Sequence, residues 1–221
     1  MVTLKTEVFM YRVLFFIIFS IFITACGSSS TTKFEYKTAE QNSDDVESSP
    51  GVEAQNAIRQ IPQISEEQKQ EFLDAVNSAR ADTQDCGSEG VFPPAPALTW
   101  SDELYKAAYE HTRDMAINGT IEHEGSNTNS DWTAQDLKLG RGSHFYERIE
   151  HNGYTNYKIV EENVAGGTYF NSASDVVEAW LKSDGHCANL MNKDVTQIGM
   201  AHVKKSTKYT NYWSQEFGAK H

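Results

Sequence analysis

The stretch Trp180-Leu-Lys-Ser-Asp-Gly-His-Cys-Ala-Asn-Leu-Met-Asn-Lys-Asp-Val-Thr-Gln-Ile-Gly199 contains a helix end, a turn, a histidine, a cysteine and the start of a strand. The apolar residues just before this stretch and at its first positions recur on one helical face. Ser172 and Asp175 have the spacing of a capping box. We therefore predict a helix over residues 171–183.

The middle of this stretch predicts a histidine at the start of a second helix. Gly185 favours a sharp turn with positive φ, after which His186 would begin a new short helix. Residues 195–204 then have the composition of a β-strand. Two interpretations of His186 stay open from these residues alone: a side chain of a functional site, or a histidine of the helix start without chemistry.

The rest of the chain adds helices and strands around this centre. The capping box that begins at Ser65 predicts a helix over 65–83, and Ser101 begins a helix that ends at Asn118-Gly119. His111 lies in the apolar stripe of that helix, so we interpret it as a core histidine that bonds a neighbour. The polar residues 127–143 have no clear period and predict a surface loop. The remaining expected elements are a helix over 145–151, an extended segment over 158–166 and a final antiparallel hairpin with strands over 195–204 and 209–217.

This pattern predicts an α+β fold with helices on both sides of a small, mainly antiparallel sheet. The motifs resemble those of the bacterial branch of the CAP superfamily, which comprises the cysteine-rich secretory proteins, antigen 5 and pathogenesis-related 1 and is also called the SCP domain. The resemblance covers roughly residues 64–221 and implies a three-layer α-β-α sandwich with a cleft. The motifs that carry it, from the end of the chain backwards, are Tyr212-Trp-Ser-Gln-Glu-Phe-Gly218, Thr196-x-Ile-Gly-x-Ala201, Trp180-x-x-Ser-x-Gly-His-Cys-x-Asn189, Glu162-Asn163-Val-Ala, His123, Leu98-Thr-Trp100 and Val76-Asn-Ser-Ala-Arg80.

The resemblance implies a site made of His123, Glu162 and His186. Two imidazoles and a carboxylate can hold a divalent metal, zinc or magnesium, with water in an open position, and they also suit general acid–base chemistry. Many relatives carry a second acidic residue three positions after the tryptophan, where this chain has Ser183. Ser183 is a weak candidate nucleophile because no Gly-x-Ser-x-Gly elbow surrounds it.

Three functions are compatible with these residues. The interpretation we favour is a binding module whose cleft holds a small or lipid-like ligand, since some relatives bind sterols or fatty acids. The second is a metal-assisted hydrolase, such as a peptidase or a cell-wall enzyme. The third is a structural or interaction protein in which the cleft residues only support the fold.

The first 63 residues have the composition of an export signal and a tether. The apolar run 13–25 follows Arg12, is too short to span a membrane, and ends at Ile23-Thr-Ala-Cys26, which resembles a lipobox. We therefore predict a lipoprotein signal peptide over 1–25, starting at Met1 or Met10, and lipidation of Cys26, for example with palmitate. The polar residues 26–63 predict a disordered tether, and residues 64–221 the CAP/SCP domain.

Composition and cysteine content support an exported, membrane-anchored protein. The 221 residues carry a formal net charge of −12 and no cluster of Lys and Arg, which argues against nucleic acid as a partner. We expect a periplasmic or cell-surface location, at the outer membrane in a Gram-negative cell, because Gly27 replaces the aspartate that retains many lipoproteins at the inner membrane. With Cys26 lipidated, Cys86 and Cys187 remain for a disulfide, as in relatives with the Gly-His-Cys motif; two separate buried thiols are the alternative.

Overall fold

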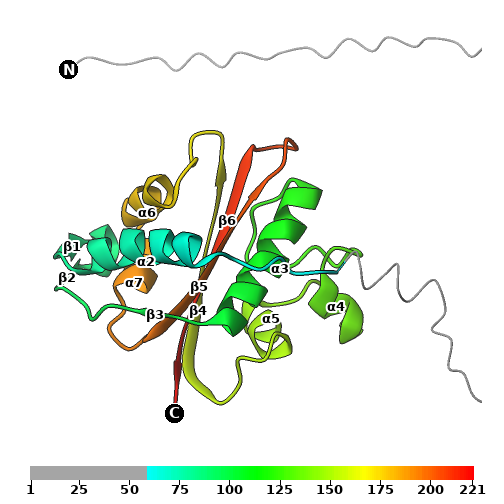
Figure 1. The fold of residues 1–221 in the computed structure, drawn as a ribbon, viewed down its shortest axis with the longest axis horizontal. Helices are drawn as coiled ribbons and strands as arrows, with labels where there is room; N and C mark the ends of the chain where they lie inside the picture. The colour runs from blue at the N-terminus through cyan, green and yellow to red at the C-terminus, as the bar shows by residue number, and fades with distance from the viewer. Residues whose placement is uncertain (1–58) are drawn as a thin grey trace, which may run out of the picture. The chain divides into compact units, whose positions relative to one another are not determined.

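The computed structural model describes residues 59–221, which form a four-stranded sheet between two layers of helices (Figure 1). The signal-peptide, lipidation and most of the tether predictions concern residues outside this range. None of the helices within residues 59–221 has the length and apolarity needed to cross a membrane. The elements are α2 (Glu66–Arg80), β1 (Gln84–Asp85), η1 (Gly87–Glu89), β2 (Val91–Phe92), β3 (Thr99–Trp100), α3 (Asp102–Asn118), α4 (Trp132–Asp136), α5 (Phe145–His151), β4 (Tyr157–Gly167), α6 (Ala173–Leu181), α7 (Asp184–Met191), β5 (Gln197–Lys204) and β6 (Asn211–Lys220).

The sheet has the strand order β3-β5-β6-β4. Only β3 runs parallel to its neighbour, and β5, β6 and β4 are antiparallel. Figure 1 shows α2, α6 and α7 on one side of the sheet and α3, α4 and α5 on the other. The predicted three-layer α-β-α sandwich with a mainly antiparallel sheet is confirmed, including the final hairpin.

Helix boundaries follow the caps that the sequence indicates. The Ser65 side chain accepts from Gln68 N at 3.2 Å, and Ser172 and Asp175 form the predicted capping box. The helices are shorter than predicted, because α2 ends at Arg80 and α6 at Leu181. The predicted positive φ at Gly185 is wrong: Gly185 lies inside α7, so Lys182 and Ser183 alone separate the two helices.

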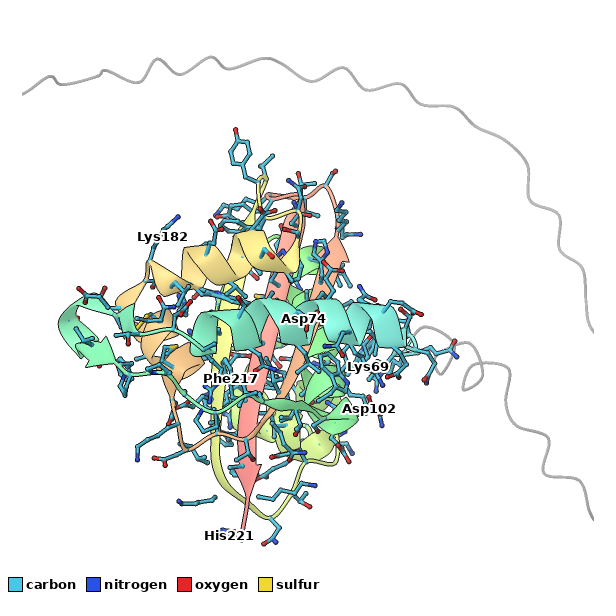
Figure 2. The ribbon with its side chains drawn as sticks, turned by 60° about the vertical axis from the view of Figure 1, so that its left-hand side comes forward. Lys69, Asp74, Asp102, Lys182, Phe217 and His221 are labelled. Atoms are coloured by element: carbon cyan, nitrogen blue, oxygen red, sulfur yellow. A yellow bond between two sulfur atoms is a disulfide. The ribbon has the colours of Figure 1, made fainter. Side chains whose placement is uncertain are left out.

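The largest core lies on the α2, α6 and α7 side of the sheet. Phe72 of α2 packs edge-on against Trp213 of β6, with ring centroids 5.8 Å apart, and Trp180 of α6 is buried in the same cluster. Figure 2 shows α2 crossing the sheet near Phe217, with Lys69 close to Asp102 at the start of α3. The Lys69 Nζ to Asp102 Oδ1 distance is 3.2 Å, so an ion pair joins helices of the two layers.

A disulfide between Cys86 and Cys187 joins the loop before η1 to the first half of α7. Their Cα atoms are 5.4 Å apart and 101 positions apart in the sequence, and the spacing is normal for a disulfide. The predicted pairing is confirmed, and the alternative of two separate thiols is wrong.

Residues 127–143 do more than form the predicted surface loop. Trp132, Thr133 and Ala134 of α4 are buried, and so is Asp131. The Asp131 carboxylate accepts from Ser143 N at 3.0 Å and from Ser143 Oγ at 2.7 Å. The loop therefore closes on a buried carboxylate, a polar core that hydrophobic periodicity does not reveal.

Substituting Gly199→Ala should strongly destabilise the protein. Gly199 of β5 lies directly against the backbone of Leu104 and Tyr105 in α3, and a Cβ there would overlap those backbone atoms. Because neither backbone can yield cheaply, we expect a loss of about 3 kcal/mol, measured by urea unfolding. Gly185→Ala is the control: nothing lies within 4 Å of its Cβ position, and alanine in a helix should add about 0.5–1 kcal/mol. Equal effects of the two substitutions would contradict this close packing of α3 on β5.

Candidate functional site

The structure brings His123, Glu162 and His186 together. Glu162 lies on β4, His123 in the loop after α3, and His186 in the first turn of α7. His123 Nδ1 lies 2.9 Å from Glu162 Oε1, and the His123 and His186 ring centroids are 6.4 Å apart. Side chains separated by up to 63 positions therefore share one site.

Arg148 of α5 holds Glu162 in place. Its Nη2 donates to Glu162 Oε2 at 2.7 Å and also to His123 O at 2.8 Å. Both side chains of the ion pair are 1% exposed. Burial alone would raise the pKa of Glu162, but the charge of Arg148 and the bond from His123 hold that pKa well below its usual value. Sequence reasoning missed Arg148, since an arginine in a short amphipathic helix resembles a solvated residue.

His111 forms the inner wall of the site. It is buried, as predicted, and its Nε2–H donates to Glu122 O at 2.8 Å. The same nitrogen lies 3.8 Å from Glu162 Oε2. Burial lowers the pKa of His111 to about 4, helped by the nearby charge of Arg148. His111 is thus a neutral donor that fixes the loop leading to His123.

Glu216 is a second buried carboxyl group that sequence reasoning did not single out. It lies opposite Glu162 in the β4–β6 register, and the Ser214 hydroxyl donates to it at 3.3 Å. Burial and the negative charge of Glu162 raise the pKa of Glu216 well above its ordinary value. The available signal was the alternation of β6, which places Glu216 and Ser214 on one face of the strand.

The pKa values of the two imidazoles, His123 exposed and His186 half-buried, are shifted in opposite directions. The hydrogen bond with Glu162 raises the pKa of His123 above 6.5, whereas burial and the proximity of His123 lower the pKa of His186. A pair of titratable groups whose pKa values are pushed apart suits one group to donate a proton and the other to accept one. At neutral pH, His123 is the better donor and His186 the better acceptor.

Two hollows meet at His123. One, of about 350 Å³, lies along the edge of β4 and is lined by His123, Phe145, Val160, Glu161, Glu162 and Asn189. The other, of about 740 Å³, lies over the loop after α3, and most of the residues that line it have polar side chains: Asn118, Thr120, Glu122, His123, Glu124, Gly125, Ser126 and Thr128. The His123 side chain is 54% exposed, so its ring is accessible from solvent.

Comparison with known proteins identifies the family of this chain. The family model described as the cysteine-rich secretory protein family, CAP, matches residues 73–217. The chain belongs to the CAP family. Similar chains in Bacillus subtilis (strain 168) are the uncharacterized protein YkwD, 25% identical over 195 residues, and the uncharacterized membrane protein YlbC, 28% identical over 120 residues. The alignments cover 88% and 54% of this chain but only 62% and 28% of the two relatives.

Solved structures that are similar to this CAP chain include an outer surface protein from Borrelia burgdorferi, at 24% identity and a TM-score of 0.45, covering 57% of this chain and 80% of that one. An extracellular protein containing an SCP domain from Bacillus anthracis has 19% identity and a TM-score of 0.48, covering 73% of this chain and 45% of that one.

A metal ion in this CAP domain would fit two of the three predicted ligands. Both Glu162 oxygens are already bonded, to His123 and to the Arg148 cation. Within residues 59–221, no group of three His, Cys, Asp or Glu side chains is arranged to hold a metal ion. The remaining donors are His123 Nε2 and the His186 ring, with Glu162 orienting His123 as carboxylates commonly do behind metal-bound histidines. Metal binding therefore stays a prediction for the two imidazoles.

Ser183 takes no part in the histidine site. It is the N-cap residue of α7, but its side chain makes no capping hydrogen bond. No hydrogen bond joins the side chains of Ser183 and His186 in the described part of the chain. The neighbouring Asp184 points the other way and accepts from Ser88 Oγ at 2.6 Å. The geometry gives Ser183 no base, so it does not support a serine nucleophile.

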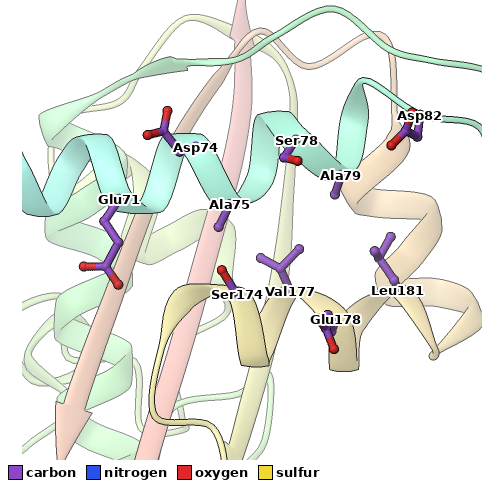
Figure 3. A pocket seen from close by; sticks show the side chains of 10 residues that line it. All are labelled: Glu71, Asp74, Ala75, Ser78, Ala79, Asp82, Ser174, Val177, Glu178 and Leu181. Atoms are coloured by element: carbon purple, nitrogen blue, oxygen red, sulfur yellow. The ribbon is translucent and has the colours of Figure 1, made fainter.

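A third hollow, of about 580 Å³, lies between α2 and α6, apart from the histidines (Figure 3). Its floor includes Ala75, Ala79 and Val177, and the carboxylates of Asp74 and Glu178 stand at its rim. Its lining contains no histidine or cysteine. Nothing in that lining pairs a base with a nucleophile, so the candidate site is the one at His123.

We predict that Arg148→Met destabilises the protein by about 3–5 kcal/mol, because it leaves the Glu162 carboxylate buried without its cation. Urea unfolding monitored by tryptophan fluorescence measures this loss. The double variant Arg148→Met, Glu162→Gln should recover part of it, since no unpaired charge then stays buried. If the loss of stability in the double variant equals the sum of the losses in the two single variants, Arg148 and Glu162 are not energetically coupled.

We also predict that His123 titrates above pH 6.5 and His186 below it in NMR spectra of the imidazole protons. Glu162→Gln should lower the pKa of His123, because it removes the carboxylate that raises it. Substitution of the exposed residue Lys182 by Gln is the control and should leave the pKa of His123 unchanged. The raised pKa also sets how stability depends on pH. The His123–Glu162 interaction stabilises the fold below pH 6.5, and this stabilisation is lost as pH rises through the raised pKa of His123. A His123 pKa that is insensitive to Glu162→Gln would contradict the arrangement.

Proposed function

We propose that this CAP protein is an exported binding module that holds a polar ligand at His123. One observation carries the proposal: Glu162, fixed by Arg148, bonds His123 Nδ1 at 2.9 Å, while the ring stays half exposed beside two hollows. A pre-oriented imidazole at the junction of concave surfaces is the arrangement expected of a recognition site. Its Nε2 is left for a ligand.

The lining favours a polar ligand over the lipid or sterol that the family resemblance suggests. Most residues around the larger hollow carry hydroxyl, amide or carboxyl groups or, in His123, an imidazole, and the neutral ones include Asn118, Ser126 and Thr128. An acyl chain lying there would take the carboxylates of Glu122 and Glu124 out of water, which is costly. We therefore narrow the expected ligand to one with its own donors and acceptors.

Export and membrane attachment through lipid on Cys26 remain part of the proposal. The disulfide supports export, because such bonds persist in oxidising compartments. The apolar run before Cys26 and the lipobox-like Ile23-Thr-Ala-Cys26 support an anchor. We place the domain at the periplasmic face or the cell surface, held by the segment that precedes residue 64.

Hydrolysis is the second candidate function. The Glu162–His123 pair resembles the carboxylate–histidine part of a catalytic triad, and the oppositely shifted pKa values of His123 and His186 suit proton transfer. Water, activated by the imidazoles or by a metal between them, would be the nucleophile, because no serine or cysteine side chain among the described residues is bonded to either ring. Activity that depends on both histidines would establish this alternative.

NMR of the full-length protein tests the binding function. We expect at least one compound in a panel of amino acids, dipeptides, N-acetylated sugars and sodium palmitate to shift the His123 and His186 imidazole signals, and we expect it to be polar. His123→Ala should weaken that binding at least about tenfold, the loss expected for one buried contact of about 1.4 kcal/mol, and Lys182→Ala, at the end of α6, should not. A response to palmitate alone would refute the polar ligand. If the His123→Ala variant binds the ligand as tightly as the unmodified protein does, the histidines have only a structural role.

A further inference from the structure

The strand that carries Glu162 lies at an edge of the sheet and is only partly covered. β4 pairs with β6 on one side and with no other strand among the described residues. On its outer side, Asn189 Nδ2 donates to Glu162 O at 3.2 Å, and Trp180 Nε1 donates to Val164 O at 3.1 Å. Side chains of α6 and α7 therefore occupy backbone acceptors at two positions of this edge, as proteins usually arrange for exposed strands.

Val160 is the preceding residue of β4 with the same orientation, and no side chain of residues 59–221 bonds its backbone. It lies opposite Gly218 of β6. Gly218 O accepts from Thr196 N at 3.0 Å, so the Gly218 backbone faces the β5 side of the sheet and not β4. Because backbone direction alternates along a strand, the N–H and C=O of Val160 point outward, as do the carbonyls of Glu162 and Val164.

These outward-facing groups open into the candidate site. Val160 lines the hollow of about 350 Å³ together with His123, and Phe145 and Asn189 form its two flanks. A hollow that offers one backbone donor and one backbone acceptor, spaced as in a strand, matches the hydrogen-bonding pattern of an extended polypeptide.

We propose that the ligand of this site is an extended peptide that pairs with β4 at Val160 and passes beside His123. This inference rests on the proposed function of the His123 site and names the ligand class. One residue of the ligand, paired antiparallel, would donate its N–H to Val160 O and accept at its C=O from Val160 N, which continues the sheet by one short strand.

The two flanks set the side chains that such a peptide should carry. Successive residues of an extended chain point to opposite faces. One face meets the ring of Phe145, which suits an apolar side chain. The other meets Glu161, whose Oε1 accepts from Asn192 at 2.7 Å while Oε2 has no hydrogen-bond partner within residues 59–221. A lysine or arginine on that side would lie beside the Glu161 carboxyl group at the wall of the hollow and complement its charge.

A capped pentapeptide of alternating valine and lysine is the probe. Two N-methylated versions, one methylated at every valine and one at both lysines, keep the side chains but block opposite edges of the extended backbone. We expect the full-length protein to bind the parent peptide, one methylated version to bind at least about tenfold more weakly, and the other to bind like the parent. Titration followed by the Val160 amide signal in NMR gives the dissociation constants. Equal weakening by both methylation patterns would overturn backbone pairing.

Val160→Pro tests the strand side of the same pairing. Proline removes the outward N–H but leaves the β4–β6 ladder intact, so folding should persist, checked by Tm. We expect at least about tenfold weaker peptide binding, whereas Val160→Thr should bind normally. If no peptide binds but a sugar or an amino acid still shifts the His123 imidazole signal, the peptide ligand is wrong and the proposed binding function still holds. If no compound shifts the imidazole signal of His123 or His186, the peptide ligand and the proposed binding function are both wrong. Dimerisation of the free protein that Val160→Pro abolishes would assign this edge to a second copy instead.

Discussion

The buried ion pair between Arg148 and Glu162 is the constraint on which the rest of the site depends. A carboxylate removed from water needs a cation and further hydrogen-bond donors, and Glu162 has Arg148 on one oxygen and His123 on the other. Arg148 also bonds the carbonyl groups of His123 and Ser143. One guanidinium therefore holds a strand, the loop after α3 and the closing end of the 127–143 loop in a single arrangement.

This arrangement explains why both sides of the sheet are needed. The side of the sheet covered by α3 and α5 contributes His111 and Arg148, which set the charge of Glu162, while α7 on the other side contributes His186. Close approach of α3 to β5 at Gly199 fixes the distance between the layers. Since the site lies at the edge strand, both layers reach it, and neither alone would form it.

Sequence patterns predicted the layers, most helix starts and the hairpin. The three candidate site residues were predicted only through the family resemblance. Caps and periodicity are local signals, so Ser65 and Ser172 could be read directly. The roles of Arg148 and Glu216 depend on which residues face each other across the fold, and no spacing along the chain encodes that. The buried Asp131 was missed for a related reason: a polar core looks like a solvated loop in sequence. The prediction for Gly185 was wrong because glycine often ends a helix, whereas here Gly185 lies in the first turn of the next helix.

The position of the disulfide links the histidine site to the redox conditions around the protein. Cys187 follows His186 directly in α7, and its bond to Cys86 ties that turn of the helix to a loop 101 positions earlier. The second imidazole is thus secured by a covalent bond that a reducing cytosol does not allow to persist. The position of the second imidazole is therefore fixed covalently only under oxidising conditions, in which this disulfide persists.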